Sequence, residues 1–156
     1  MAEIAVVYHS EHHGNTKRLL DGIAASYPLD LFDAANAEKA DLSQYRAVGF
    51  ASGIFMGKFH ASLYDFLKKF PALPQQAFLL YTSGSDNKKY GDGFASLLKE
   101  SGLQVLGVYH CRGFDTAGPW KLLGGIAKGH PSQEDIENGV RFLQKILPET
   151  PQKTEA

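Results

Sequence analysis

The 156-residue sequence has little of several features that mark particular classes of protein. Its single cysteine, Cys111, cannot form an internal disulfide, which is typical of a protein in a reducing cytoplasm. No apolar run approaches the length of a membrane span, and Met1 is followed almost directly by an apolar strand, without a signal peptide. The formal net charge of -1 gives no indication of a nucleic-acid or membrane partner. We therefore expect a cytoplasmic protein that binds no nucleic acid and does not insert into a membrane.

The composition is typical of a globular protein. Hydrophobic residues make up 44% and charged residues 21% of the chain, which argues against disorder. A chain of this length closes a hydrophobic core without metals or disulfides. No repeat, low-complexity tract or linker interrupts it, so residues 1–156 are predicted to form a single domain.

Short apolar runs alternate with segments of helical periodicity along the whole chain. The runs that predict strands cover residues 4–8, 29–32, 47–51, 77–81 and 104–110. The predicted helices cover residues 16–26, 60–70 and 94–100, followed by a last helix that starts at a capping box of Ser132 and Asp135. This alternation predicts the α/β class, with a doubly wound five-stranded parallel sheet between two layers of helices.

Polar loops follow the first, third and fourth predicted strands. The first loop carries Ser10, His12, His13, Gly14, Asn15 and Thr16. Its hydroxyls and amides, and the positive end of the following helix dipole, are suited to hold an anion such as a phosphate. The alternative is that Gly14, Asn15 and Thr16 form only a turn and a helix cap. Because all three loops fall at the carboxyl edge of the sheet, where ligands bind in this architecture, we favour the anion site.

The segments YHSEHHGNTK, SGIFMGKF and TSGSDN, each placed after a strand, resemble the flavodoxin family, which binds FMN. The resemblance spans Ile4 to Leu147 and implies the strand order 2-1-3-4-5. It implies that the first-loop residues surround the FMN phosphate. It also implies that two further sets of residues contact the flavin ring and its polar edge. These are Ser52, Gly53, Ile54, Phe55, Met56 and Gly57 for the ring, and Ser83, Gly84, Ser85 and Asp86 for the edge.

Two features of this resemblance bear on the site. The first loop is one residue longer than the usual Ser/Thr-x-Thr-Gly-x-Thr pattern, with His12 and His13 in place of the threonine before the glycine. Phe55 or Phe59 is the candidate to stack on the flavin ring.

Neither the histidines nor the cysteine predicts a separate chemistry. Adjacent histidines seldom point the same way, and no Cys, His or carboxylate spacing accompanies His12 and His13, so no metal site is predicted. An imidazole beside a phosphate is the preferred interpretation of that pair. Cys111, at a strand end, is expected to be a buried thiol, and no catalytic nucleophile is predicted.

The sequence leaves three functions open. The first is an FMN-binding electron-transfer protein that exchanges electrons with unidentified redox partner proteins and needs no catalytic residue. The second is an FMN-dependent NAD(P)H:quinone-type oxidoreductase, in which the Gly-rich segment 112–131 walls a substrate pocket. The near-neutral net charge favours this interpretation, since electron carriers in the family are usually strongly acidic and bind their partners through charge. The third is a protein-binding scaffold that has lost the flavin.

Overall fold

A computed structural model describes residues 2–11, 14–37, 40–69, 72–113 and 129–148, and all structural statements below concern those residues. His12, His13 and most of the segment 112–131 lie outside them, so the predictions made for those residues stay predictions. Among the described helices, none combines the length and apolar character needed to cross a membrane.

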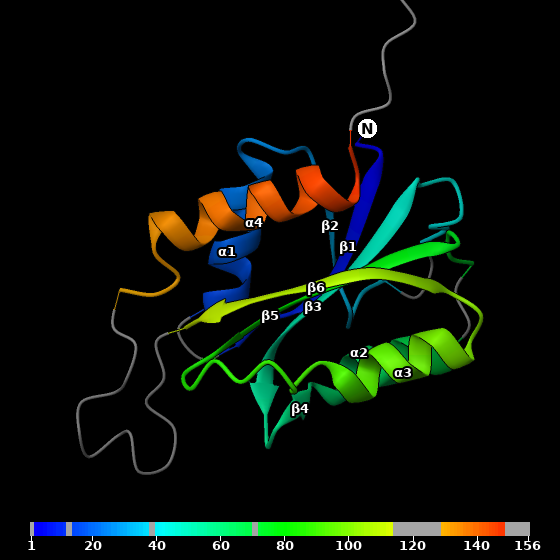
Figure 1. Cartoon of the computed structure of the whole chain (residues 1–156). Coiled ribbons are helices and arrows are strands. Elements are labelled where there is room, and N and C mark those ends of the chain that lie inside the picture. The colour runs from blue at the N-terminus through cyan, green and yellow to red at the C-terminus, as the bar shows by residue number, and fades with distance from the viewer. Residues whose placement is uncertain (1, 12–13, 38–39, 70–71, 114–128, 149–156) are drawn as a thin grey trace, which may run out of the picture.

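Five parallel strands form the centre of the molecule (Figure 1). In sheet order they are β2 (Asp30–Asp33), β1 (Ile4–His9), β3 (Ala47–Phe55), β5 (Gln76–Ser83) and β6 (Gln104–Arg112). Every neighbouring pair in this order is parallel. The order is the predicted one, since the fourth and fifth predicted strands are β5 and β6, and the doubly wound architecture is confirmed.

Helices cover both faces of the sheet. α1 and α4 lie on one face, and α2 and α3 lie on the other (Figure 1). Their bounds are α1 (Asn15–Ala24), α2 (Ala61–Lys68), α3 (Asp92–Glu100) and α4 (Gln133–Ile146). The predicted capping box starts α4, because the Ser132 hydroxyl accepts from the Asp135 amide while the Asp135 carboxylate accepts from the Ser132 amide.

The sheet is apolar on both faces because alternate residues of each central strand point to opposite sides. In β1, Ala5 and Val7 pack in the core that lies against α2 and α3. Ile4 and Val6 pack in the core that lies against α1 and α4. All four side chains are buried, which explains why the first apolar run shows no polar alternation.

The segment after the third predicted strand differs from expectation. The strand was predicted to end at Ala51, but β3 continues to Phe55 and pairs antiparallel with a short strand, β4 (Lys58–Phe59). Met56 and Gly57 connect the two with φ angles of 52° and 78°. Two successive residues with positive φ are the signature of the tightest hairpin turn, whose twist matches that of paired strands. A methionine is an unusual first residue for that turn, so the sequence did not predict the hairpin.

Candidate functional site

The loops after β1, β3 and β5 meet at the carboxyl edge of the sheet, as expected from parallel pairing. The last residues of these strands are in register, with His9 opposite Ser52 and Gly53 opposite Thr82. A hydrogen bond between two hydroxyls ties this edge to α1, because Thr16 Oγ1 lies 3.0 Å from Thr82 Oγ1. Both threonines are buried, at 1% and 3% exposure. The first turn of α1 is therefore fixed directly over the ends of β3 and β5.

The first loop folds back over the start of α1. Gly14 is the N-cap, with φ 66° and no side-chain cap of its own, and the Ser10 hydroxyl accepts from the Lys17 amide at 3.1 Å. The amides at a helix start lack partners within the helix, and they carry the positive end of its dipole. Ser10, Gly14, Asn15 and Thr16 thus lie together at one helix end. That they bind an anion stays a prediction.

The chain after β6 closes in on the same helix end. A Cβ added to Gly113 would lie 2.7 Å from Asn15 Nδ2, so any larger residue at this position would require Asn15 to move. The Gly113 amide donates to the Ser83 carbonyl at 3.1 Å. The end of β6 therefore also borders the first loop. The sequence did not predict this contact.

Ser52 supports this edge from inside. It is fully buried, and its hydroxyl accepts from the His60 amide at 3.0 Å while donating to the Gly53 carbonyl. His60 in turn caps α2, because its Nδ1 accepts from the Ser62 amide at 3.1 Å. The structure thus gives Ser52 a positioning role for the join of β3, β4 and α2.

The β3–β4 hairpin projects from the edge and carries the residues expected to face a flavin ring. Met56 is fully exposed at its tip. Phe59, one of the two aromatic candidates, is 3% exposed and stacks on Phe94 in the core with ring centroids 5.1 Å apart. Phe59 is therefore a core residue, which leaves Phe55 as the aromatic of this hairpin at the edge. Tyr90 also reaches the hairpin, since a Cβ on Gly57 would lie 3.9 Å from its ring.

The loop after β5 is held in shape by its own polar groups. Ser83 Oγ accepts from the Asp86 amide at 3.0 Å, and Ser85 Oγ lies 2.9 Å from Tyr90 Oη. Asp86 has φ 48°, and its Oδ1 lies 2.5 Å from Nδ1 of His110 on β6. Gly84 is buried within this loop. His110 and Tyr90 are members of the site that sequence reasoning missed.

Burial raises the pKa of two groups near the edge, Tyr81 and Cys111. Burial, and then the charges of Asp86 and Asp92, raise the pKa of Tyr81 to about 12, so its hydroxyl stays protonated and donates to the Asn87 carbonyl. Burial likewise raises the pKa of the Cys111 thiol far above its ordinary value, and the side chain is 4% exposed. The prediction of a buried Cys111 is confirmed, and a neutral buried thiol is inert as a nucleophile.

Comparison with known proteins agrees with this geometry. A family model described as a flavodoxin domain matches residues 5–113. An uncharacterized protein of Methanocaldococcus jannaschii is 33% identical over 144 residues, which cover 91% of this chain and 96% of that protein.

Solved structures share the fold at lower identity. A flavodoxin from the domain Archaea superimposes with a TM-score of 0.60 at 16% identity, covering 92% of this chain and 98% of that one. The apo form of an NADH:FMN oxidoreductase superimposes with a TM-score of 0.56 at 17% identity, covering 95% of this chain and 91% of that one. At such identities the likeness concerns the fold alone.

Proposed function

The chain belongs to the flavodoxin family, and on that premise we propose that it binds FMN noncovalently at the carboxyl edge of its sheet and transfers electrons. The observation that carries this proposal is the convergence of the loops after β1, β3 and β5 on the start of α1, tied together by the Thr16–Thr82 hydrogen bond. A flavin phosphate and a flavin ring need adjoining but different surroundings, and this edge offers both.

The start of α1 fits the phosphate. Ser10 Oγ accepts from the Lys17 amide, so its own proton is available for a phosphate oxygen. Thr16 Oγ1 can donate to a phosphate oxygen when Thr82 donates the proton of their shared hydrogen bond. Apart from its neighbours in the chain, no described residue has an atom within 4 Å of the position of a Cβ on Gly14, which leaves that side of the backbone open. Helix amides and hydroxyls together can hold a dianion without a lysine or arginine.

The hairpin and the loop after β5 fit the ring. Ile54, Phe55, Met56 and Gly57 offer apolar side chains and peptide groups on one side, and Gly84, Ser85 and Asp86 offer polar groups on the other. When bound, FMN supplies the redox chemistry, and the chain orients the ring, limits water around it and sets its potential through nearby hydrogen bonds and charges. In this role the protein exchanges electrons with redox partner proteins in the cytoplasm.

One observation favours a second function, an FMN-dependent NAD(P)H:quinone-type oxidoreductase. The pairing of His110 Nδ1 with Asp86 Oδ1 at 2.5 Å fixes the ring of His110 and directs its other nitrogen, Nε2, away from the carboxylate. An imidazole held this way can deliver or remove a proton at Nε2 during substrate reduction. The net charge of -1 also gives weak electrostatic docking to a carrier's partners.

Two measurements test these proposals in order. Titration of the purified protein with FMN should give a 1:1 complex with a perturbed visible spectrum and quenched flavin fluorescence; the absence of any complex refutes both functions. Steady-state oxidation of NADH or NADPH with a quinone then separates them. Turnover that falls at least tenfold in His110→Asn identifies the reductase, whereas negligible turnover together with reduction by a flavodoxin reductase identifies the carrier.

A further inference from the structure

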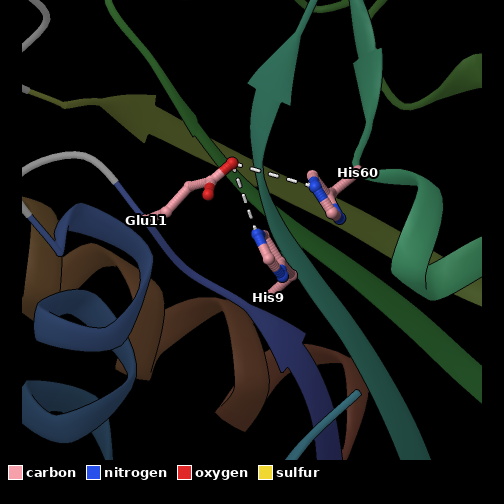
Figure 2. Close-up of side chains that lie close together, drawn as sticks. All are labelled: His9, Glu11 and His60. Atoms are coloured by element: carbon pink, nitrogen blue, oxygen red, sulfur yellow. Dashed lines mark ion pairs between the residues drawn. The ribbon is translucent and has the colours of Figure 1, made fainter. Parts of the chain in front are cut away.

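Three side chains that carry metal-binding atoms lie together where the first loop begins (Figure 2). His9 comes from the end of β1, Glu11 from the loop that follows, and His60 from the residue before α2. Glu11 Oε1 lies 3.6 Å from His9 Nε2 and 3.8 Å from His60 Nε2, and the ligand atoms of all three residues lie within 4.8 Å of one another. The sequence did not suggest this group, because His60 is far from the other two along the chain.

The distances do not match hydrogen bonds. Nitrogen and oxygen atoms that share a proton lie about 2.7 to 3.2 Å apart, shorter than both separations here. His9 Nε2 is buried and has no hydrogen-bond partner among the described residues, although a buried imidazole nitrogen ordinarily has one. The carboxylate therefore faces two imidazole nitrogens across a gap that direct hydrogen bonds do not fill.

The same distances match the edges of a metal coordination shell. Zinc bonds of about 2.0 to 2.1 Å to nitrogen and oxygen, arranged as a tetrahedron, place neighbouring ligand atoms about 3.4 Å apart. Two neutral imidazoles and one carboxylate carry a single negative charge, which suits a divalent cation. Two histidines and one carboxylate with an open position are also an established donor set for zinc and neighbouring transition metals.

We propose that His9, Glu11 and His60 bind a divalent transition-metal ion of the zinc class, with water completing the coordination. The imidazole rings are stacked, with centroids 3.5 Å apart and planes inclined by 4°. Because a nitrogen lone pair lies in the plane of its ring, the two rings must tilt open around the ion when it binds. Phe55 contacts both rings edge-on, at 4.9 Å from His60 and 5.8 Å from His9, so it borders the site.

Ser62 has a defined positioning role in this proposal. In the structure, His60 Nδ1 accepts from the Ser62 amide, which places the proton of a neutral ring on Nε2. Metal binding at Nε2 moves that proton to Nδ1, which then stops accepting from the Ser62 amide and instead donates to Ser62 Oγ, 2.9 Å away. Hydrogen bonds of this kind orient metal-bound histidines, and their loss typically weakens binding by about tenfold to a hundredfold.

The test is a titration of chelator-treated protein with Co²⁺, followed by absorption, and with Zn²⁺, followed by calorimetry. The expected result is one ion per chain, with intense visible Co²⁺ bands that Zn²⁺ removes by competition. Glu11→Gln and His60→Asn should each weaken binding by more than the about tenfold to hundredfold typical of losing an outer-shell partner, because each removes a direct ligand. Asparagine also caps helices well, so His60→Asn preserves the start of α2. Ser62→Ala should weaken binding by about tenfold and leave the stoichiometry unchanged.

The control variant is His130→Ala, since His130 pairs with Asp135 at a different place and should leave the titration unchanged. Absence of binding in the parent protein, or binding unaffected by both Glu11→Gln and His60→Asn, overturns the proposal. Binding lost in His12→Ala or His13→Ala but kept in His60→Asn also overturns it, because the ion then belongs to the neighbouring histidines. The titration uses no flavin, so its outcome is independent of whether FMN binds.

Discussion

Replacing Thr16 with valine tests the centre of the proposed site. Valine has the shape of threonine but no hydroxyl, so Thr16→Val removes one partner of a hydrogen bond that is buried at both ends. The hydroxyl of Thr82 is then left buried without a partner among the described residues. Such a loss costs about 1 to 3 kcal/mol of the free energy of unfolding. For a chain of this size, each kcal/mol lowers the melting temperature by about 2 to 4 °C.

The double variant Thr16→Val with Thr82→Val is the matched control for stability. It removes both polar groups together, so no buried hydroxyl is left unpaired, and such paired replacements are nearly neutral. Urea unfolding of the parent, both single variants and the double variant therefore forms a complete cycle. We expect each single variant to be less stable than the double variant. A double variant as unstable as the sum of the two single variants would contradict the role of this pair.

The double variant also isolates the effect on ligand binding. If the Thr16 hydroxyl donates to the phosphate, its loss weakens FMN by about 1.5 to 3 kcal/mol, or about tenfold to a hundredfold, since the acceptor is charged. Riboflavin lacks the phosphate and should bind the parent and the double variant equally. Fluorescence titration with both ligands measures the difference. Equal losses for FMN and riboflavin would mean that Thr16 acts only through the fold, and that the phosphate site is misassigned.

Three further predictions concern other parts of the chain. Cys111 should react with a thiol reagent only after unfolding, because it is buried and neutral; rapid labelling of the native protein would contradict this. The pKa of Asp135 is below its ordinary value because, although burial opposes ionisation, hydrogen bonds from Ser132 and His130 outweigh it. The Asp135 carboxylate should therefore stabilise the fold above about pH 4, and this stabilisation should be lost as the pH falls through the lowered pKa. Urea unfolding at a series of pH values should show that the free energy of unfolding depends less on pH in Asp135→Asn than in the parent. Met56→Asn should raise stability by about 1 kcal/mol, since asparagine tolerates positive φ, yet weaken FMN binding if the exposed methionine covers the ring. Unchanged stability would contradict the strain assigned to Met56, and unchanged FMN affinity would contradict its contact with the ring.

The sequence predicts most of the fold because its signals are local. Apolar runs bounded by turns mark the five parallel strands, and the Ser132–Asp135 box marks the start of α4 correctly. The β3–β4 hairpin was missed for an equally local reason. Its turn has Met56 where a hairpin usually has asparagine, aspartate or glycine, so the residue types did not indicate a tight turn.

The site is predicted less completely because its contacts join distant segments. Sequence reasoning places the loop residues at one edge, since parallel strands end together. It does not pair Thr16 with Thr82 or Asp86 with His110, because these contacts depend on strand register and on how α1 docks. His110 could have been found once register was known, as it lies opposite Tyr81 in the sheet.

The charge of Glu11 links the two proposals made for this edge. Glu11 follows Ser10 directly, so its carboxylate lies in the loop proposed to hold a dianionic phosphate, where a negative charge opposes binding. A divalent cation held by His9, Glu11 and His60 changes the formal charge of that cluster from -1 to +1. The repulsion between this cluster and the phosphate then becomes an attraction. Any such coupling is reciprocal, so the ion strengthens phosphate binding by the same factor by which the phosphate strengthens ion binding. The Glu11 carboxylate alone disfavours phosphate binding, and an ion held together with His9 and His60 would offset that repulsion.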